Sequence, residues 1–129
     1  MDNIKAYKRK AEFLYRWIRL GQSNTTIEML LERRGYKNIV IYGFNELSKA
    51  MIYELEASKI VVKYIIDQKG DRINFDFPSY TIDEVEINNE IDAIIIVLTD
   101  KQQTEEIKTR LKELFTGNVL DMGELLYEL

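Results

Sequence analysis

The stretch NIVIYGFNELS, residues 38–48, decides the fold class of this chain. Its apolar run at 39–42 has the length and composition of a buried strand, and Gly43 ends that run. A helix is predicted over 45–57, because apolar residues recur there with helical spacing. A buried strand that passes through a glycine turn into an amphipathic helix is typical of a parallel α/β sheet.

The same alternation of strands and helices continues to the end of the chain. Further strands are predicted at 60–66, 75–80, 91–98 and 118–120, a turn at 68–71, and helices at 101–115 and 123–129. Pro78 restricts its segment to a short edge strand, whereas 91–98 is the most apolar segment and is predicted to be central in the sheet. Right-handed crossovers then give a Rossmann-like α/β domain with about five parallel strands in the order 3-2-1-4-5.

A helical hairpin precedes the predicted sheet. The first helix, at 3–20, has an apolar face made of Tyr7, Ala11, Leu14 and Ile18, widened by Phe13, Trp17 and Leu20. Gly21 is expected to end this helix. Thr25 and Glu28 have the spacing of a capping box, which predicts a short second helix that reaches Gly35.

Charge is distributed unevenly along the chain. Residues 1–37 carry nine basic and four acidic side chains, a net charge of +5, whereas 38–129 carry nine basic and eighteen acidic ones, a net charge of -9. We divide the chain into a helical hairpin at 1–36 and a Rossmann-like nucleotide-binding domain at 37–129. The basic, aromatic helix at 4–20 is expected to pack on the sheet, or to form a homo-oligomer or bind a partner enzyme, in preference to an anionic membrane surface.

Composition excludes several classes of chemistry. The 129 residues include no Cys and no His, which excludes disulfides, zinc ribbons, thiolate nucleophiles and Ser-His-Asp catalysis. No motif supplies paired carboxylates, so no metal site is expected, and a net charge of -4 argues against general nucleic-acid binding. The amino terminus lacks a signal peptide's apolar stretch, and the longest aliphatic run, 93–98, is too short to cross a membrane. We therefore expect a cytoplasmic protein.

The candidate binding site follows from the predicted strand order. Ligands of doubly wound sheets bind beyond the carboxyl ends of the strands, where the strand order reverses. The rim of that crevice is predicted to comprise Gly43, Phe44, Asn45, Glu46, Leu47, Asp67, Gln68, Thr99 and Asp100. Asp67 ends the second strand, at a distance along the chain that suits a carboxylate binding the hydroxyls of a ribose, and its charge favours NAD over NADP. Thr99 and Asp100 also fit the N-cap and first turn of the next helix, and we favour that structural role.

At these residues the chain resembles a known family. Residues 36–126 resemble the Rossmann-like NAD(P)-binding domains of bacterial surface-polysaccharide biosynthesis proteins, namely the amino-terminal domains of nucleotide-sugar dehydratases or epimerases and of sugar acyltransferases. The segments that carry the resemblance are IYG at 41–43, EL at 46–47, ID at 66–67, IDAIIIV at 91–97 and the lead-in LERRGYK at 31–37. The resemblance implies a Rossmann fold that binds a nucleotide or dinucleotide, and it brings no catalytic residues with it.

Two positions depart from that family's pattern. Its first turn commonly reads IYGxGELG, and the second and third glycines are Asn45 and Ser48 in this chain. Asn45 is predicted to be the N-cap of the following helix, where its side chain occupies the N–H groups that an anion would otherwise bind. The same residues therefore fit either a ligand site or a capped helix without a ligand.

Three functions are compatible with these sequence features. The leading hypothesis is a stand-alone module that binds a nucleotide, an NAD-like dinucleotide or a nucleotide-sugar and has an accessory or sensing role in polysaccharide biosynthesis. The alternative is an interaction or oligomerisation scaffold with a degenerate Rossmann site. The third is an NAD-dependent oxidoreductase or a subunit of a nucleotide-sugar-modifying enzyme, although the sequence contains no Tyr-x-x-x-Lys pair, P-loop or nucleophile elbow.

Overall fold

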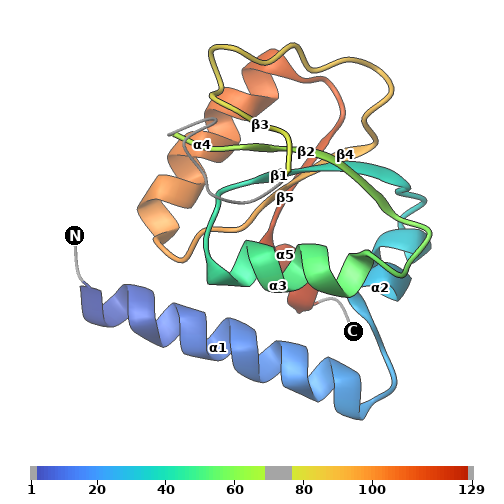
Figure 1. The fold of residues 1–129 in the computed structure, drawn as a ribbon. Helices are drawn as coiled ribbons and strands as arrows, with labels where there is room; N and C mark the ends of the chain where they lie inside the picture. Colours follow the sequence, from blue (N-terminus) through green and yellow to red (C-terminus); the bar gives the residue numbers. More distant parts are fainter. Residues whose placement is uncertain (1–2, 69–76, 128–129) are drawn as a thin grey trace.

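Five parallel strands form one sheet with helices on both faces (Figure 1). The computed structural model describes residues 3–68 and 77–127. The strands are β1 Asn38–Tyr42, β2 Val61–Ile66, β3 Ser79–Tyr80, β4 Ala93–Ile96 and β5 Asn118–Asp121. The helices are α1 Asn3–Gln22, α2 Ile27–Arg33, α3 Glu46–Leu55, α4 Lys101–Leu114 and α5 Met122–Leu126. The order β3-β2-β1-β4-β5 confirms the predicted Rossmann-like topology.

The strand β1 lies at the centre of the sheet, between β2 and β4. Its last residue, Tyr42, is in register with Ile66 of β2 and with Ile96 of β4. The chain leaves β1 toward α3 and leaves β4 toward α4, and these two helices cover opposite faces. The reversal of strand order therefore lies at the carboxyl ends of β1 and β4, as the sequence predicted.

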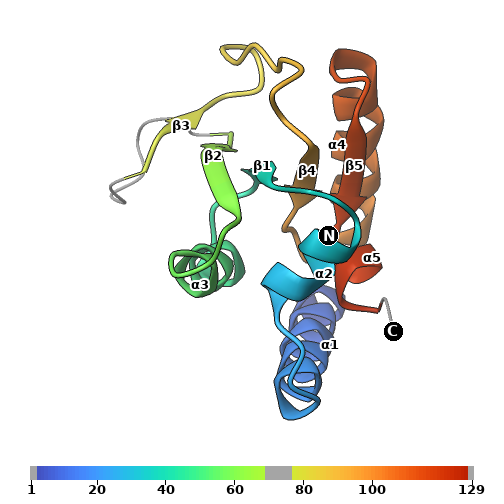
Figure 2. The same ribbon diagram turned by 90° about the vertical axis from the view of Figure 1, so that its right-hand side faces the viewer.

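Unequal layers cover the two faces of the sheet (Figure 2). One face packs against α1, α2, α3 and α5 in a core that includes Ile39, Met51 and Leu125. The other face packs against α4, with Leu111 and Phe115 against the strands. All four residues of β4 are buried, which agrees with its predicted central position.

The orientation of α1 differs from the simple sequence pattern. Phe13 and Leu20 are each only 2% exposed, and Trp17 packs against the same core. The stripe that includes Tyr7 and Ile18 instead faces solvent, with these two side chains 71% and 60% exposed. Helical spacing identifies two adjacent apolar faces, and the bulky side chains of the second face fit the surface offered by α3 and α5.

The boundaries of the hairpin helices differ slightly from the predicted ones, and α2 ends at Arg33, before the predicted Gly35. The helix α1 continues through Gly21, and Asn24, with φ of 58°, adopts the left-handed conformation that ends it. The N-cap of α2 is Thr26, whose side chain accepts a hydrogen bond from the Met29 N–H, so the predicted cap at Thr25 is wrong by one residue. The chain offers two adjacent threonines, and the second of them caps the helix.

Other boundaries shift by a few residues. The helix predicted at 45–57 is the shorter α3, and Asn45 is its N-cap as predicted. The strand predicted at 91–98 is reduced to β4, and the helix predicted at 123–129 is α5, which begins one residue earlier. The strand predicted at 75–80 is the two-residue β3; positions 75–76, and 69–71 of the turn predicted at 68–71, lie outside the described residues.

The hairpin is bonded directly to the sheet domain through Glu54 of α3. One carboxylate oxygen accepts from the Trp17 indole Nε1 at 3.0 Å, and the other accepts from the Ile27 N–H at 3.0 Å. Buried residues of both α1 and α2 belong to the same core as the sheet. Among the described residues, no helix is both long enough and apolar enough to cross a membrane.

Candidate functional site

The junction between β1 and α3 is tightly packed at Gly43. Its φ of +103° is one that residues with a side chain rarely adopt. A Cβ placed there would lie 2.7 Å from the Val97 carbonyl oxygen at the end of β4. Glycine is required here because the backbones following β1 and β4 approach each other closely.

Asn45 uses its whole side chain to close this junction. Its Oδ1 accepts from the N–H groups of Leu47 and Ser48 at 2.9 and 3.0 Å, and its Nδ2 donates to the Val97 carbonyl at 2.7 Å. The Ser48 hydroxyl accepts from the Asn45 N–H at 2.8 Å, which completes a capping box. The N–H groups at which a Rossmann domain binds pyrophosphate are therefore already bonded within the protein.

Asp67 participates in the same closed junction. One of its carboxylate oxygens accepts from the Phe44 N–H at 3.2 Å, and its own N–H donates to the Tyr80 carbonyl at 2.9 Å. Burial, followed by the negative charge of Asp67, raises the pKa of the nearby Tyr42 phenol. The phenol is therefore neutral at physiological pH, and Asp67 links the end of β2 to the turn that leads into α3.

The junction between β4 and α4 has a different construction. Asp100 is the N-cap of α4 and accepts from the Gln103 N–H at 2.9 Å, so the capping role predicted for this segment is present but lies one residue later than expected, and Thr99 precedes the cap. The Thr104 hydroxyl donates to the Asp100 carbonyl at 2.7 Å. This cap is made with the first turns of α4 itself, whereas the Asn45 cap also reaches the backbone that follows β4.

A cavity of about 740 Å³ lies beside this second junction. Its walls come from the first half of α1 and from the start of α4, two segments far apart in the sequence. It is lined by Lys5, Ala6, Lys8, Arg9, Glu12, Thr99, Asp100, Lys101, Gln102 and Glu105. Four of these side chains are cationic and three are acidic, and one of the acids, Asp100, already caps α4.

Arg9 is placed between this cavity and the core. Its guanidinium carbon lies 5.1 Å from the centre of the Phe13 ring, a cation–π contact that fixes the side chain. Its Nη1 is buried and has no hydrogen-bond partner among the residues that the structure describes. Arg9 shares this feature with Arg16 Nε and Tyr64 Oη, which are also buried without a partner among the described residues.

A second cavity, of about 240 Å³, borders the first. It is lined by Ala6, Tyr7, Lys10, Asn45, Glu46, Leu47 and Thr99. Ala6 and Thr99 line both cavities, so the two spaces are neighbours at the carboxyl edge of the sheet. Lys10 bridges α1 and α3 through an ion pair with Glu46 at 3.1 Å.

The structure divides the predicted rim into two groups. Residues 45–47 and 99–100 line the cavities, and the small cavity brings Asn45 and Thr99 together. The others, Gly43, Phe44, Asp67 and Gln68, lie outside the lining of both cavities. Phe44 has the Lys49 Nζ 5.0 Å from the centre of its ring, and Gln68 is exposed.

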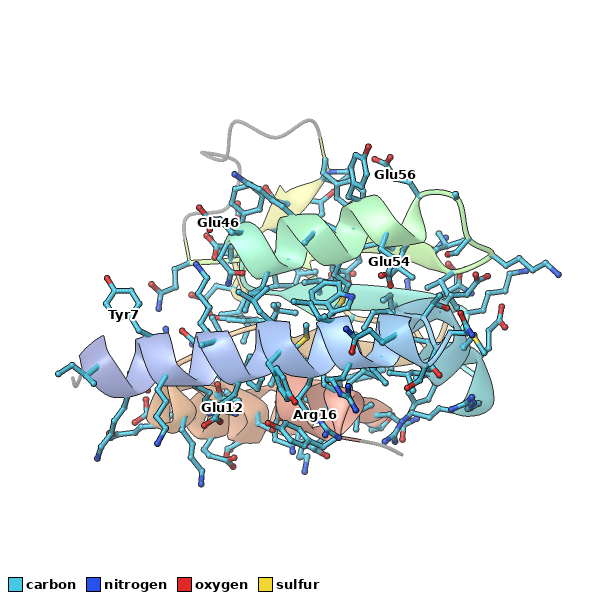
Figure 3. All side chains as sticks on the ribbon, turned by 90° about the horizontal axis from the view of Figure 1, so that it is seen from below. Tyr7, Glu12, Arg16, Glu46, Glu54 and Glu56 are labelled. Atoms are coloured by element: carbon cyan, nitrogen blue, oxygen red, sulfur yellow. The ribbon has the colours of Figure 1, made fainter. Side chains whose placement is uncertain are left out.

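Sequence reasoning did not place α1 at this site. Lys5, Lys8 and Arg9 line the large cavity, and Lys10 lines the small one. The sequence feature that could have identified them is the concentration of positive charge in the first 37 residues. That feature suggests an intermolecular contact but does not show where in the fold these cations lie. Only the tertiary path of α1, whose first turns lie at the carboxyl edge of the sheet, brings these cations to the crevice (Figure 3).

No family model, curated protein or solved structure matches this chain. Within the described residues, no group of three or more carboxylate, imidazole or thiolate side chains is arranged to hold a metal ion. The physical chemistry of the crevice is therefore the basis for a functional assignment.

Proposed function

We propose that this protein is a non-catalytic module that binds a phosphate-bearing ligand, a nucleotide or a nucleotide-sugar, in the crevice between α1 and the carboxyl ends of β1 and β4. The observation that carries this proposal is the 740 Å³ cavity with cations from both α1 and α4. Its volume lies within the range of roughly 300–1,000 Å³ that small-molecule sites occupy.

The phosphate groups would lie beside Lys8, Arg9 and Lys101. Guanidinium and ammonium groups form charge-assisted hydrogen bonds with phosphate oxygens, and all three of these side chains line the cavity. The base or sugar would then extend into the smaller cavity, where Tyr7 and Leu47 supply apolar surface. A nucleoside phosphate has the length and the mixed polarity that this pair of neighbouring cavities favours.

This placement differs from that of a dinucleotide in a Rossmann domain. Asn45 occupies the position at which pyrophosphate approaches α3, so the ligand is proposed to bind on the α4 side of the crevice. The proposal therefore favours a mononucleotide or a nucleotide-sugar over NAD. We also propose an accessory role in surface-polysaccharide synthesis, and this part of the proposal rests on the resemblance of residues 36–126 to domains of that pathway's proteins.

A second candidate function is an interaction scaffold whose Rossmann site has been lost. The observation that favours it is the set of bonds made by Asn45, which satisfies the first turn of α3 without any ligand. The two candidates differ in one measurable property, which is whether nucleotides stabilise the folded protein.

Thermal unfolding with ADP, UDP, UDP-sugars, NAD, NADP and CoA tests the proposal. A ligand at 100 times its dissociation constant stabilises the folded state by about 2.7 kcal/mol, which shifts the melting temperature by several degrees. We expect a shift with one class of nucleotide, and a binding constant at least tenfold weaker in the Lys8→Ala/Lys101→Ala variant. Both of these lysines are exposed, so the variant is expected to fold normally.

The matched control is Arg33→Ala. Arg33 is an exposed cation on α2 that lines neither cavity, so its loss should leave the ligand response unchanged. A protein that gives no shift with any nucleotide would favour the scaffold. A shift that the lysine variant retains in full would place the ligand elsewhere.

A further inference from the structure

The outward face of α1 carries an apolar stripe that the protein's own core does not cover. We define the α1 stripe as Ile4, Tyr7, Ala11, Leu14 and Ile18. Its large members are 78%, 71%, 41% and 60% exposed in that order, and Ala11 is exposed as well. Most surface helices of globular proteins instead direct their apolar stripe toward the core and their polar residues outward.

The spacing of the α1 stripe is that of a helix–helix seam. Its members follow one another at intervals of three, four, three and four residues, which is the a/d pattern of a heptad repeat. Ile4 and Ile18 occupy a positions and Leu14 a d position, the types that favour two-stranded pairing. Ala11, in the middle, allows a second helix to approach closely.

We propose that the α1 stripe is a dimer interface that binds the same stripe of a second copy of this chain. A two-fold axis places identical patches against each other, so a seam that is complementary to itself needs no other partner. Apart from Tyr15, which lies beside the stripe on α1, the remaining large exposed apolar side chains of the described residues are dispersed over other elements: Met29, Tyr53, Val61, Tyr80, Leu114 and Tyr127.

The exposed area is sufficient for such a dimer. Large aromatic side chains cover roughly 150–250 Å² each, so the α1 stripe and the adjacent Tyr15, itself 61% exposed, present on the order of 600 Å² per molecule. Two copies together exceed the total of about 1,000 Å² that a specific interface requires.

Charged side chains border the stripe but do not interrupt it. The stripe contains no charged side chain, so two copies can meet without burying an ion. Glu12 on α1 and Glu46 on α3 lie on its two sides (Figure 3), and Glu46 has a side chain that is 82% exposed. The helix also carries the exposed cations Lys5, Lys8 and Arg19, so the choice of a second copy rests on the uncharged stripe and its exposed area.

Sedimentation equilibrium of the full chain tests the proposal. We expect a dimer at tens of micromolar and a Leu14→Lys/Ile18→Lys variant that dissociates at least a hundredfold more readily. The matched control, Tyr53→Lys/Leu114→Lys, introduces the same charges at exposed apolar residues of α3 and α4 and should remain dimeric. Ala11→Arg is a second disruptive variant, since it keeps a good helix former and blocks close approach at the centre of the seam.

Circular dichroism shows whether each variant is folded. A wild-type protein that stays monomeric at several hundred micromolar would overturn the proposal, as would a folded stripe variant that dimerises as well as the wild type. Co-sedimentation of a monomeric protein with phosphatidylserine vesicles, lost in the stripe variant, would assign the stripe to a lipid surface instead. Leu14 and Ile18 line neither cavity, so their substitution leaves the lining of the proposed nucleotide site intact, although Tyr7 belongs both to the stripe and to the small cavity.

Discussion

The β1–α3 and β4–α4 junctions lie next to each other at the carboxyl edge of the sheet, and each begins its helix with a side-chain cap. At the first, Asn45 also binds across to Val97, and Gly43 leaves no space between the strand ends. At the second, the Asp100 cap stays within its own helix, and a cavity with cationic walls remains beside it.

This difference indicates where a ligand is able to bind. An anion at α3 must compete with an amide that already satisfies two N–H groups, and removing an N-cap typically costs about 1 kcal/mol. An anion in the large cavity meets the cations of α1 and α4. Under the proposed function, the Rossmann topology is retained while the anion binds beside the β4–α4 junction and not at the β1–α3 junction.

Gly43→Ala should reduce stability more than any other substitution considered, because its new side chain pushes apart the backbones at the β1–α3 junction. The new Cβ would lie 2.7 Å from the Val97 oxygen at a φ of +103°, so we expect a loss of about 3 kcal/mol or more in the free energy of unfolding. Urea denaturation measures this loss. Gly21→Ala is the control: it lies in α1 with open space around it, and replacing glycine within a helix should stabilise the protein by up to about 1 kcal/mol. Equal effects at the two glycines would show that the close approach at Gly43 is not needed for stability.

The strand order and the closed junction differ in how far the sequence predicts them. The apolar runs at 39–42 and 91–98 predict the sheet, because buried parallel strands need continuous apolar residues. The cap at Asn45 is predictable as well, since asparagine before an amphipathic run has few other roles. Its bond to Val97 is not predictable, because that contact depends on the distance between two strand ends.

The cavity and the orientation of α1 depend on tertiary packing even more strongly. Tyr7 and Phe13 are both apolar members of one amphipathic helix, and spacing alone cannot show which of them faces the core. The choice follows from the shape that α3 and α5 present to α1. Lys8 and Arg9 line the large cavity only because of that choice.

Substitution of the two N-cap residues, Asn45 and Asp100, should have the next largest effect on the free energy of unfolding. Asn45→Ala removes two bonds to N–H groups and one to the Val97 carbonyl, so we expect a loss of about 2 kcal/mol in stability. Asp100→Ala removes one cap bond and should cost about 1 kcal/mol. Both losses are measured by denaturant unfolding. The comparison between the junctions would fail if the Asp100 variant were the less stable of the two.

Substitution of Asp92, at the opposite edge of the same two strands, should have the smallest effect on the free energy of unfolding. Asp92 also serves as a reference for a carboxylate with a purely structural role. Its Oδ2 accepts from the N–H groups of Asn38 and Lys37 at 2.8 and 2.9 Å, and these two bonds hold the pKa of Asp92 below its usual value. The folded protein therefore binds this proton less tightly than the unfolded chain does. The resulting stabilisation is fully present above about pH 4 and is lost as the pH falls through the lower pKa of the folded state.

Asp92→Asn should accordingly lower stability by at most about 1 kcal/mol at pH 7, because the carboxylate is partly exposed to solvent. The difference between wild type and variant should shrink as the pH is lowered below 4, and unfolding curves recorded at several pH values measure it. Nucleotide-induced thermal shifts should be the same in both proteins, since Asp92 lies at the edge of the sheet away from the crevice. A difference that stayed constant down to low pH would mean that the charge of Asp92 contributes nothing and that an amide is merely a poorer fit. A changed ligand response would mean that the two edges of the sheet are coupled. The difference between the two junctions would then depend on residues at the far ends of β1 and β4 as well.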